Sequence, residues 1–422
     1  MLQNVSPMEV IATIIFAVAV LHTFSTKFFA QLAHVQPAHA GFWHLLSEVE
    51  VVFGFWAFIF MLVVFFFLGQ STAVDYVDSR NFTEPFFVFA IMVIAASRPI
   101  LKAVEASITF LAGVLPVNRA LAMFFLCLAL LPLLGSFITE PAAMTLGALM
   151  LRDSFYRYGL SRRLKYATIA VLFVNISVGG TLTNFAAPPV LMVADSWGWS
   201  SHYMLMNFGW KAAFAVFFNA LFVTWYFRKE IAAKGKIPEV APDQRVPLVV
   251  VGVHLAFLAG VVAFSHHPAV FLGLFLFFLG YTEAYSRYQD RLLLREALMV
   301  AFFLAGLVVL GGLQQWWLQP AISDVEPVPI FFLATALTAI TDNAALTYLA
   351  SLIQGVSIEF KHAVMAGAVT GGGLTVIANA PNPAGMSILR SDFDDQAVSP
   401  MGLLLSALPP TFVVICVFLF FG

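Results

Sequence analysis

Charged residues are scarce in this sequence. Asp, Glu, Lys and Arg make up 10% of its 422 residues, whereas a soluble domain carries about 25%. The hydrophobic share is 61% and the mean hydropathy is +0.91, so the composition indicates an integral membrane protein. The formal net charge of -2 offers no basic surface, and no nucleic-acid partner is expected.

Cysteine and catalytic motifs are also nearly absent. Cys127 and Cys416 both lie in apolar runs, so we expect neither a disulfide framework nor a thiolate metal site. The HExxH, GxSxG and Walker patterns do not occur. The sequence therefore predicts neither an enzyme nor a cofactor. The first residues lack the basic segment of a signal peptide, so the first apolar run is expected to be retained.

Long apolar runs dominate the chain instead. A membrane span needs about 20 mostly apolar residues, and on this criterion we expect an all-α protein with about 10 full spans. Residues 98–116 look amphipathic and interfacial. Two further apolar stretches, 118–153 and 328–357, each contain a central acidic residue. The expected spans lie near 9–32, 44–69, 84–97, 165–194, 203–227, 247–265, 268–285, 296–316, 363–389 and 401–421.

The loops alternate in their content of Lys and Arg. Three loops are basic, within 152–165, 228–245 and 287–295, whereas the loops between them lack Lys and Arg. The positive-inside rule then places the basic loops in the cytoplasm and the N-terminus outside. We expect a multi-pass protein of the inner membrane, in contact with lipid.

Two motifs occur twice, in the same order. Residues 137–146, FITEPAAMTL, align with 339–348, AITDNAALTY; residues 179–189, GGTLTNFAAPP, align with 371–381, GGGLTVIANAP. Gly/Pro-interrupted segments at matching positions of two halves indicate a transporter binding site. We expect helix breaks at 179–189 and 371–383.

The topology depends on whether the apolar stretches 118–153 and 328–357 cross the membrane fully. Full crossings would make the two repeats parallel, whereas re-entrant hairpins with tips near 140 and 342 would make them inverted. Arms of about 14 residues, or about 21 Å, reach only the midplane, so we favour hairpins. The expected domains are 1–83 (N-terminal scaffold helices), 84–227 (repeat 1), 228–246 (cytoplasmic linker) and 247–421 (repeat 2).

The carboxylates in the tips carry the functional prediction. Glu140 and Asp342 both follow a threonine and precede Ala-Ala within two residues. A charge within the bilayer is costly, so such residues are functional candidates by default. The alternative is helix capping, with Thr139 and Thr341 as N-caps and an acid in the first turn. Both interpretations can hold together, because a hairpin tip begins a helix at the midplane.

The broken helices supply oxygen ligands. Non-helical backbone at membrane depth needs protein or water to satisfy it, and its free carbonyls suit a hard cation such as Na⁺. The alternative is a packing kink. Close approach of the backbone is expected at Gly179, Gly180, Gly371 and Gly372. The side chains that could supply oxygen ligands to the cation are those of Thr181, Thr183, Asn184, Thr375, Asn379 and Asn382.

Two other polar residues are less specific. Asn175, one turn before the first glycine pair, either lines the site or packs between helices. Lys211 either pairs with a carboxylate or extends to the membrane surface.

The motifs TDNAALTYL and GGGLTVIANAPNP, with their counterparts TEPAAMTL and GGTLTNFAAPP, resemble the signature of the ion transporter superfamily. Over residues 85–421 the chain is most similar to its sodium/proton antiporters, a group near the D-type antiporters and the arsenite permeases. The resemblance implies a homodimer with a scaffold domain and a mobile transport domain moved by an elevator-like motion. It nominates Glu140, Thr183, Asn184, Asp342, Asn343, Thr375 and Asn379 as site residues.

The tips depart from the dicarboxylate branch of that superfamily. They read Thr-Glu-Pro and Thr-Asp-Asn instead of Ser-Asn-Thr, which disfavours di- and tricarboxylate substrates and favours cation exchange. Pro141, in place of the expected Asn, departs further from the pattern.

We therefore expect a secondary transporter that exchanges Na⁺ for protons by competition at the two carboxylates. One alternative is a sodium-coupled symporter of a small neutral or anionic solute with the same fold. A non-transporting membrane scaffold or receptor is the other.

Overall fold

A computed structural model describes residues 5–237, 246–393 and 396–421 of the chain. Within these ranges the structure is helical and contains no β-strand. Part of the expected linker, including Arg245, lies outside the described residues, as do Asp394 and Asp395.

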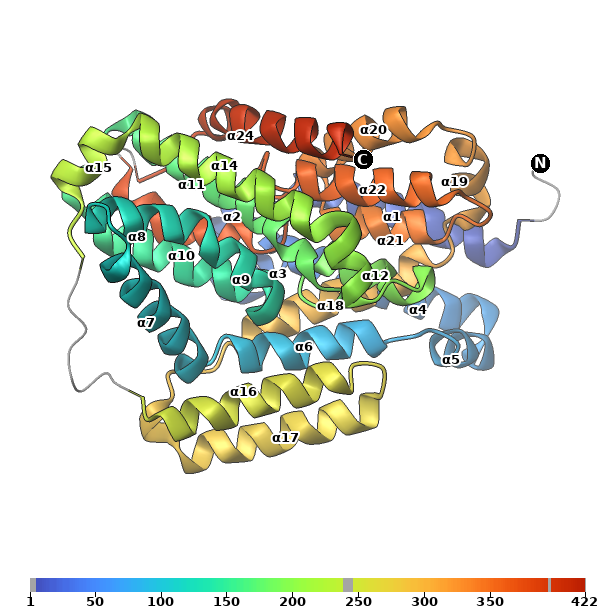
Figure 1. Cartoon of the computed structure of the whole chain (residues 1–422). Helices are drawn as coiled ribbons and strands as arrows, with labels where there is room; N and C mark the ends of the chain where they lie inside the picture. Colours follow the sequence, from blue (N-terminus) through green and yellow to red (C-terminus); the bar gives the residue numbers. More distant parts are fainter. Residues whose placement is uncertain (1–4, 238–245, 394–395, 422) are drawn as a thin grey trace.

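The first half of the chain (Figure 1) contains α1 (Pro7–Phe24), α2 (Thr26–Val35), α3 (Ala40–Ser47), α4 (Val49–Leu68), α5 (Gln70–Asp78), α6 (Thr83–Ala95), α7 (Arg98–Val114), α8 (Arg119–Leu128), α9 (Leu130–Ile138), α10 (Glu140–Ser154), α11 (Arg162–Gly179), α12 (Pro188–Trp197), α13 (Ser201–Met204) and α14 (Trp210–Tyr226). The second half contains α15 (Arg228–Lys234), α16 (Leu248–Ala263), α17 (Pro268–Ala284), α18 (Leu294–Gly311), α19 (Gln315–Ile322), α20 (Pro327–Ile340), α21 (Asn343–Ser351), α22 (Ile358–Gly371), α23 (Asn382–Leu389) and α24 (Pro400–Phe420).

Several helices are long and apolar enough to cross a membrane. Six qualify in the described residues, or up to eight if two bent helix pairs each count as one span. The bent pairs are α6 with α7, at 61°, and α8 with α9, at 42°. The apolar helices α16 and α17 have 16 and 17 residues, about 24–26 Å, just under the usual length of a span. The protein is thus an all-helical, multi-pass membrane protein.

The expected first span near 9–32 is wrong as a single helix. The chain leaves the helix at Ser25, which separates α1 from α2. The hydroxyl of Thr23 donates to the Val20 carbonyl and that of Ser25 to the Leu21 carbonyl. Such side-chain bonds compete with the backbone ladder of a helix, and the hydropathy of the run does not reveal them.

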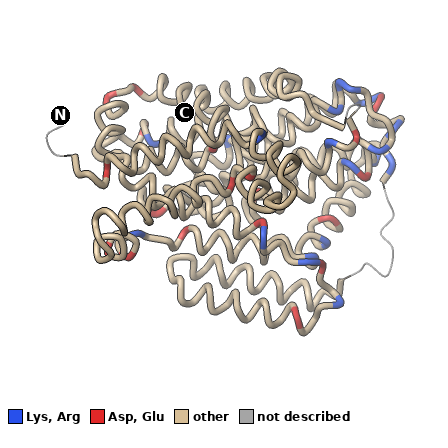
Figure 2. The backbone as a smooth tube through the Cα atoms, turned by 180° about the vertical axis from the view of Figure 1, so that it is seen from behind, with Lys and Arg blue, Asp and Glu red and all other residues tan. Residues whose placement is uncertain are grey.

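The first-half helices α1, α4 and α6 pack with α18 from the second half. The helices α16 and α17 lie outside this group, against α6 (Figure 1). Lys and Arg residues gather most densely at one end of the molecule, where α15 lies (Figure 2). The positive-inside rule predicts that this end faces the cytoplasm.

The two halves exchange short helices at the centre of the molecule. The short helix after the first break, α12, packs against α21, which belongs to the second hairpin. The short helix after the second break, α23, packs against α10 of the first hairpin. Segments far apart in the chain are thereby placed side by side, and the candidate site lies at this exchange.

Candidate functional site

The first hairpin turns at Thr139, between α9 and α10. This residue is 2% exposed and has a φ of 72°, in the left-handed region that a β-branched residue rarely adopts. Strained backbone of this kind costs about 1–3 kcal/mol and is concentrated at functional sites. Thr139 stands at the N-cap position of α10, but its side chain makes no capping hydrogen bond. The capping interpretation therefore does not account for this tip.

Glu140 follows in the first turn of α10 and is fully buried. Its Oε2 accepts a hydrogen bond of 2.9 Å from Asn379 Nδ2, and its Oε1 has no hydrogen-bond partner among the described residues. A Cβ atom on Gly180 would overlap Oε1, so only glycine allows the carboxylate to lie against the first break. Glu140 thus joins the first hairpin, the first break and the second break.

The second hairpin turns at Thr341 and Asp342, between α20 and α21. Asp342, not Thr341, is the N-cap of α21: its Oδ1 accepts from the backbone N–H groups of Ala344 and Ala345, at 2.8 and 3.2 Å. The expectation of Thr341 as the cap is wrong, because its hydroxyl donates to the Leu337 carbonyl of the preceding helix. Capping occupies Oδ1 only, so it does not exclude ion binding by the same side chain.

Asn343, next to Asp342, anchors the second tip to the second break. Its backbone N–H donates to the Ala378 carbonyl at 3.2 Å, while both polar atoms of its fully buried side chain lack partners among the described residues. Gly372 lies so close that an added Cβ would overlap Ser177 Oγ and approach Asn343 Nδ2 to 3.1 Å. The second tip thus also lies against a glycine of a break.

The structure interrupts the helix at both predicted places. Helix α11 ends at Gly179, followed by one 3-10 turn, Gly180–Leu182, and α12 starts at Pro188. Helix α22 ends at Gly371, and α23 starts at Asn382. In each case a glycine pair ends the first part, and proline occupies the first turn of the second part, where its missing N–H is not needed.

The threonines of the breaks attach them to the hairpins. Thr183 donates to the Ser136 carbonyl at 2.6 Å, and Thr375 donates to the Ala339 carbonyl at 2.8 Å. These are corresponding contacts in the two repeats, because each runs from the aligned threonine to the end of the hairpin arm before the carboxylate. Thr181 instead donates within its own turn, to Val178. The hydroxyls thus hold the shape of the breaks.

Ser136, which the sequence analysis did not select, is central to the first attachment. Its Oγ donates to the Gly179 carbonyl at 2.7 Å and accepts from the Leu182 N–H at 2.9 Å. It thereby satisfies one free carbonyl and one free N–H of the break. A serine in an apolar run gives no sequence signal that distinguishes this role from ordinary helix packing.

Replacing Ser136 by alanine should destabilise the protein. The buried Gly179 carbonyl and Leu182 N–H would lose their partner, and an unpaired buried group costs about 1–3 kcal/mol. We expect a lower unfolding temperature for Ser136→Ala in detergent, measured by intrinsic fluorescence. Ser107→Ala is the control, because that exposed hydroxyl bonds only to Ala103 of its own helix. Equal unfolding temperatures for the two variants would contradict the role of Ser136.

Three other candidates lie in different surroundings. Asn184 bonds to the Trp199 carbonyl and to the Ser201 hydroxyl, beyond the first break. Asn175 donates to the carbonyls of Leu128 and Val216 and accepts from Asn219, which favours the helix-packing alternative. Lys211 lies over the Trp210 ring and forms no ion pair with a described residue, so pairing with a carboxylate is not observed.

Buried oxygen atoms without partners gather at the tips and the second break. Asn382 Nδ2 donates to the carbonyls of Gly372 and Thr375, which leaves its Oδ1 free. Buried polar atoms are nearly always hydrogen-bonded, to protein, ordered water or an ion, so a group of exceptions indicates a place for water or an ion. No cluster of three or more His, Cys, Asp and Glu suited to a metal occurs in the described part of the chain. The unpartnered oxygens are Thr139 Oγ1, Glu140 Oε1, Asn343 Oδ1, Asn379 Oδ1 and Asn382 Oδ1.

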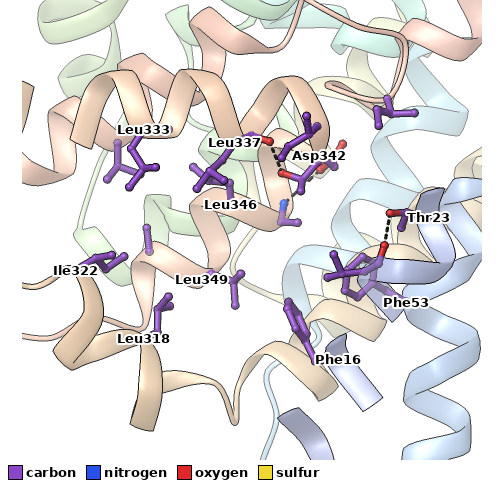
Figure 3. Close-up of a pocket in the computed structure, with 18 of the residues that line it drawn as sticks. Phe16, Thr23, Phe53, Leu318, Ile322, Leu333, Leu337, Asp342, Leu346 and Leu349 are labelled. Carbon is purple, nitrogen blue, oxygen red and sulfur yellow. Dashed lines mark hydrogen bonds between the residues drawn. The ribbon is translucent and has the colours of Figure 1, made fainter. Parts of the chain in front are cut away.

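Asp342 also faces a cavity of about 310 Å³ (Figure 3). Its lining comes from α1, α4, α18, α19, α20, α21 and α22, and is almost entirely apolar, as the side chains of Phe16, Phe53 and Leu346 illustrate. The second hairpin therefore meets α1 and α4 across a loosely filled apolar space. Glu50, in the first turn of α4, lies near this boundary and lines a smaller cavity with Asp342 and Asn379.

Comparison with known proteins identifies the family of the chain. The family model described as "Putative Na+/H+ antiporter" matches residues 7–421. The chain belongs to this family. No curated protein matches the chain. The family indicates a transporter rather than an enzyme, with Na⁺ and protons as the transported ions, and it confirms the resemblance drawn from the repeated motifs.

Proposed function

We propose that the protein exchanges Na⁺ for protons by competition at Glu140 and Asp342. The observation that carries the proposal is the fully buried Glu140 carboxylate, which accepts from Asn379 with one oxygen and leaves the other unpartnered beside Gly180. Unpartnered amide and hydroxyl oxygens also occur at both tips and at the second break. A hard cation such as Na⁺ requires oxygen ligands of this kind.

Competition follows from the chemistry of a buried carboxylate. Removal from water favours the protonated form, whereas a neighbouring cation favours the ionised form. A site that holds Na⁺ therefore releases its proton, and a proton that arrives displaces Na⁺. Two carboxylates also disfavour an anionic substrate, which they would repel.

The movement that we propose is elevator-like. The two hairpins and two interrupted helices form the moving part, while the N-terminal helices of 1–83 remain as the scaffold. The apolar cavity between the second hairpin and α1 and α4 supports this assignment, because its lining offers few hydrogen bonds to break on sliding. We further propose inverted repeats, 84–227 and 247–421, and a homodimer in the inner membrane.

The test uses the purified protein in liposomes that contain a pH-sensitive dye. An inward Na⁺ gradient is expected to drive protons outward, with a response to Li⁺ or K⁺ measured in parallel for selectivity. Protein-free liposomes give the leak. If Na⁺ moves no protons at any pH tested, antiport is wrong; Na⁺-dependent uptake of a labelled solute would then support the symporter alternative.

A further inference from the structure

A small cavity lies between the scaffold helix α4 and the second break. Its volume is about 30 Å³, and Glu50, Asp342, Asn379 and Ala380 line it, with apolar side chains such as Val300. A cavity needs about 10–15 Å³ of such volume to hold one water molecule. This cavity therefore has room for at least one particle of that size, such as a water molecule or a small cation.

The polar lining of the cavity is acidic on two sides. Glu50 belongs to α4 and Asp342 to the second hairpin tip, two segments far apart in the chain. Glu50 forms no ion pair with a described residue, and Asp342 uses Oδ1 for its helix cap. Two carboxylates in one small cavity repel each other when ionised, and a cation between them removes the repulsion. The lining thus has the charge that a cation requires.

Asn379 supplies an independent indication of a ligand. This residue is fully buried, and its Nδ2 is fixed by the bond to Glu140. The fixed amide leaves Oδ1 as an acceptor, and no described residue donates to it. Because Asn379 lines the cavity, its side chain connects Glu140 with the space between Glu50 and Asp342.

A favourable interaction with the helix dipole does not by itself explain the position of the Glu50 carboxylate. An acid in the first turn of a helix interacts favourably with the helix dipole, and Glu50 occupies that position in α4. A solvated surface would serve this purpose equally well, as it does for Glu9 in α1. The dipole does not require the carboxylate of Glu50 to share an otherwise apolar cavity with Asp342.

We propose that Glu50, Asp342 and Asn379 form a binding cavity for the transported monovalent cation, with Glu50 as the ligand that the scaffold contributes. The proposal rests on the proposed function and extends it to a residue of the scaffold. Since α4 lies outside both repeats, Glu50 completes the cavity only while the moving part occupies the position seen in this structure. Transport then includes a transfer of the cation away from Glu50.

The experiment compares Glu50→Gln with Glu48→Gln in liposomes. Glu48 is the matched control because it lies at the same helix start but pairs with Arg295 at 3.6 Å, away from the cavity. We expect Glu50→Gln to raise the apparent KM for Na⁺ at least about tenfold, as for the loss of a charged ligand. Glu48→Gln should keep the wild-type KM, and Glu50→Asp should recover part of the affinity.

A second measurement covers a variant that does not transport at all. Na⁺ should raise the unfolding temperature of the wild type, because it binds the folded state, and this increase should be smaller in Glu50→Gln. An unchanged KM, or an unchanged Na⁺-induced increase in an inactive variant, would overturn the proposal. If the wild type itself exchanges no ions, the proposed function fails instead, so the two failures are distinguishable.

Discussion

Asp342→Asn is expected to lower Na⁺-driven proton exchange at least about a hundredfold, which corresponds to about 2.7 kcal/mol. The substitution removes the charge but keeps the cap of α21, because the amide oxygen of Asn accepts from Ala344 and Ala345 as Oδ1 of Asp342 does. The variant thereby separates the two interpretations of this residue. Capping alone predicts full transport, whereas ion binding predicts almost none.

The controls use the same position and its counterpart. Asp342→Ala loses cap and charge together, so it should also unfold at a lower temperature, by the equivalent of about 1 kcal/mol. Glu140→Gln keeps an acceptor for Asn379 Nδ2 and should lose transport like Asp342→Asn. Wild-type exchange rates in both Asp342→Asn and Glu140→Gln would reject the carboxylate mechanism, and dye quenching in liposomes measures them.

Local features of the site could be predicted from the sequence. Glycine pairs followed by proline within an apolar run specify an interrupted helix, and both breaks occur where expected, at Gly179 and Gly371. A carboxylate within an apolar stretch specifies a special environment, and Glu140 is indeed fully buried. These predictions succeed because each depends on a few neighbouring residues and on the cost of polar groups in a membrane.

Contacts between distant segments could not be predicted in the same way. Nothing in the local pattern shows that Glu140 bonds to Asn379, 239 residues later. Glu50 lies at the start of a helix, where an acidic residue gives no signal of its own, and only the packing of α4 brings it to Asp342. Hydropathy also registers apolar runs but not the breaks and bends within them, such as the bends between α6 and α7 and between α8 and α9.

Gly371→Ala should disrupt both stability and transport. A Cβ at this position would overlap the Thr335 carbonyl and come within 2.8 Å of Thr338 Cβ, so α22 would have to move away from α20. Overpacking of this kind costs about 1–3 kcal/mol. The displacement also strains the bond from Thr375 to the Ala339 carbonyl. We expect a lower unfolding temperature and a clear loss of Na⁺-driven exchange.

The matched variant in the first repeat tests whether the two breaks are built alike. A Cβ on Gly179 would lie 2.8 Å from the Pro132 carbonyl oxygen, a milder clash with the corresponding hairpin arm, so Gly179→Ala should show the same defects to a smaller degree. Gly280→Ala in α17 is the control, since nothing lies within 4 Å of its added Cβ and alanine favours a helix by about 1 kcal/mol. If Gly371→Ala were as stable and active as Gly280→Ala, close contact between hairpin and break would not be required, because the second break would then tolerate separation from α20.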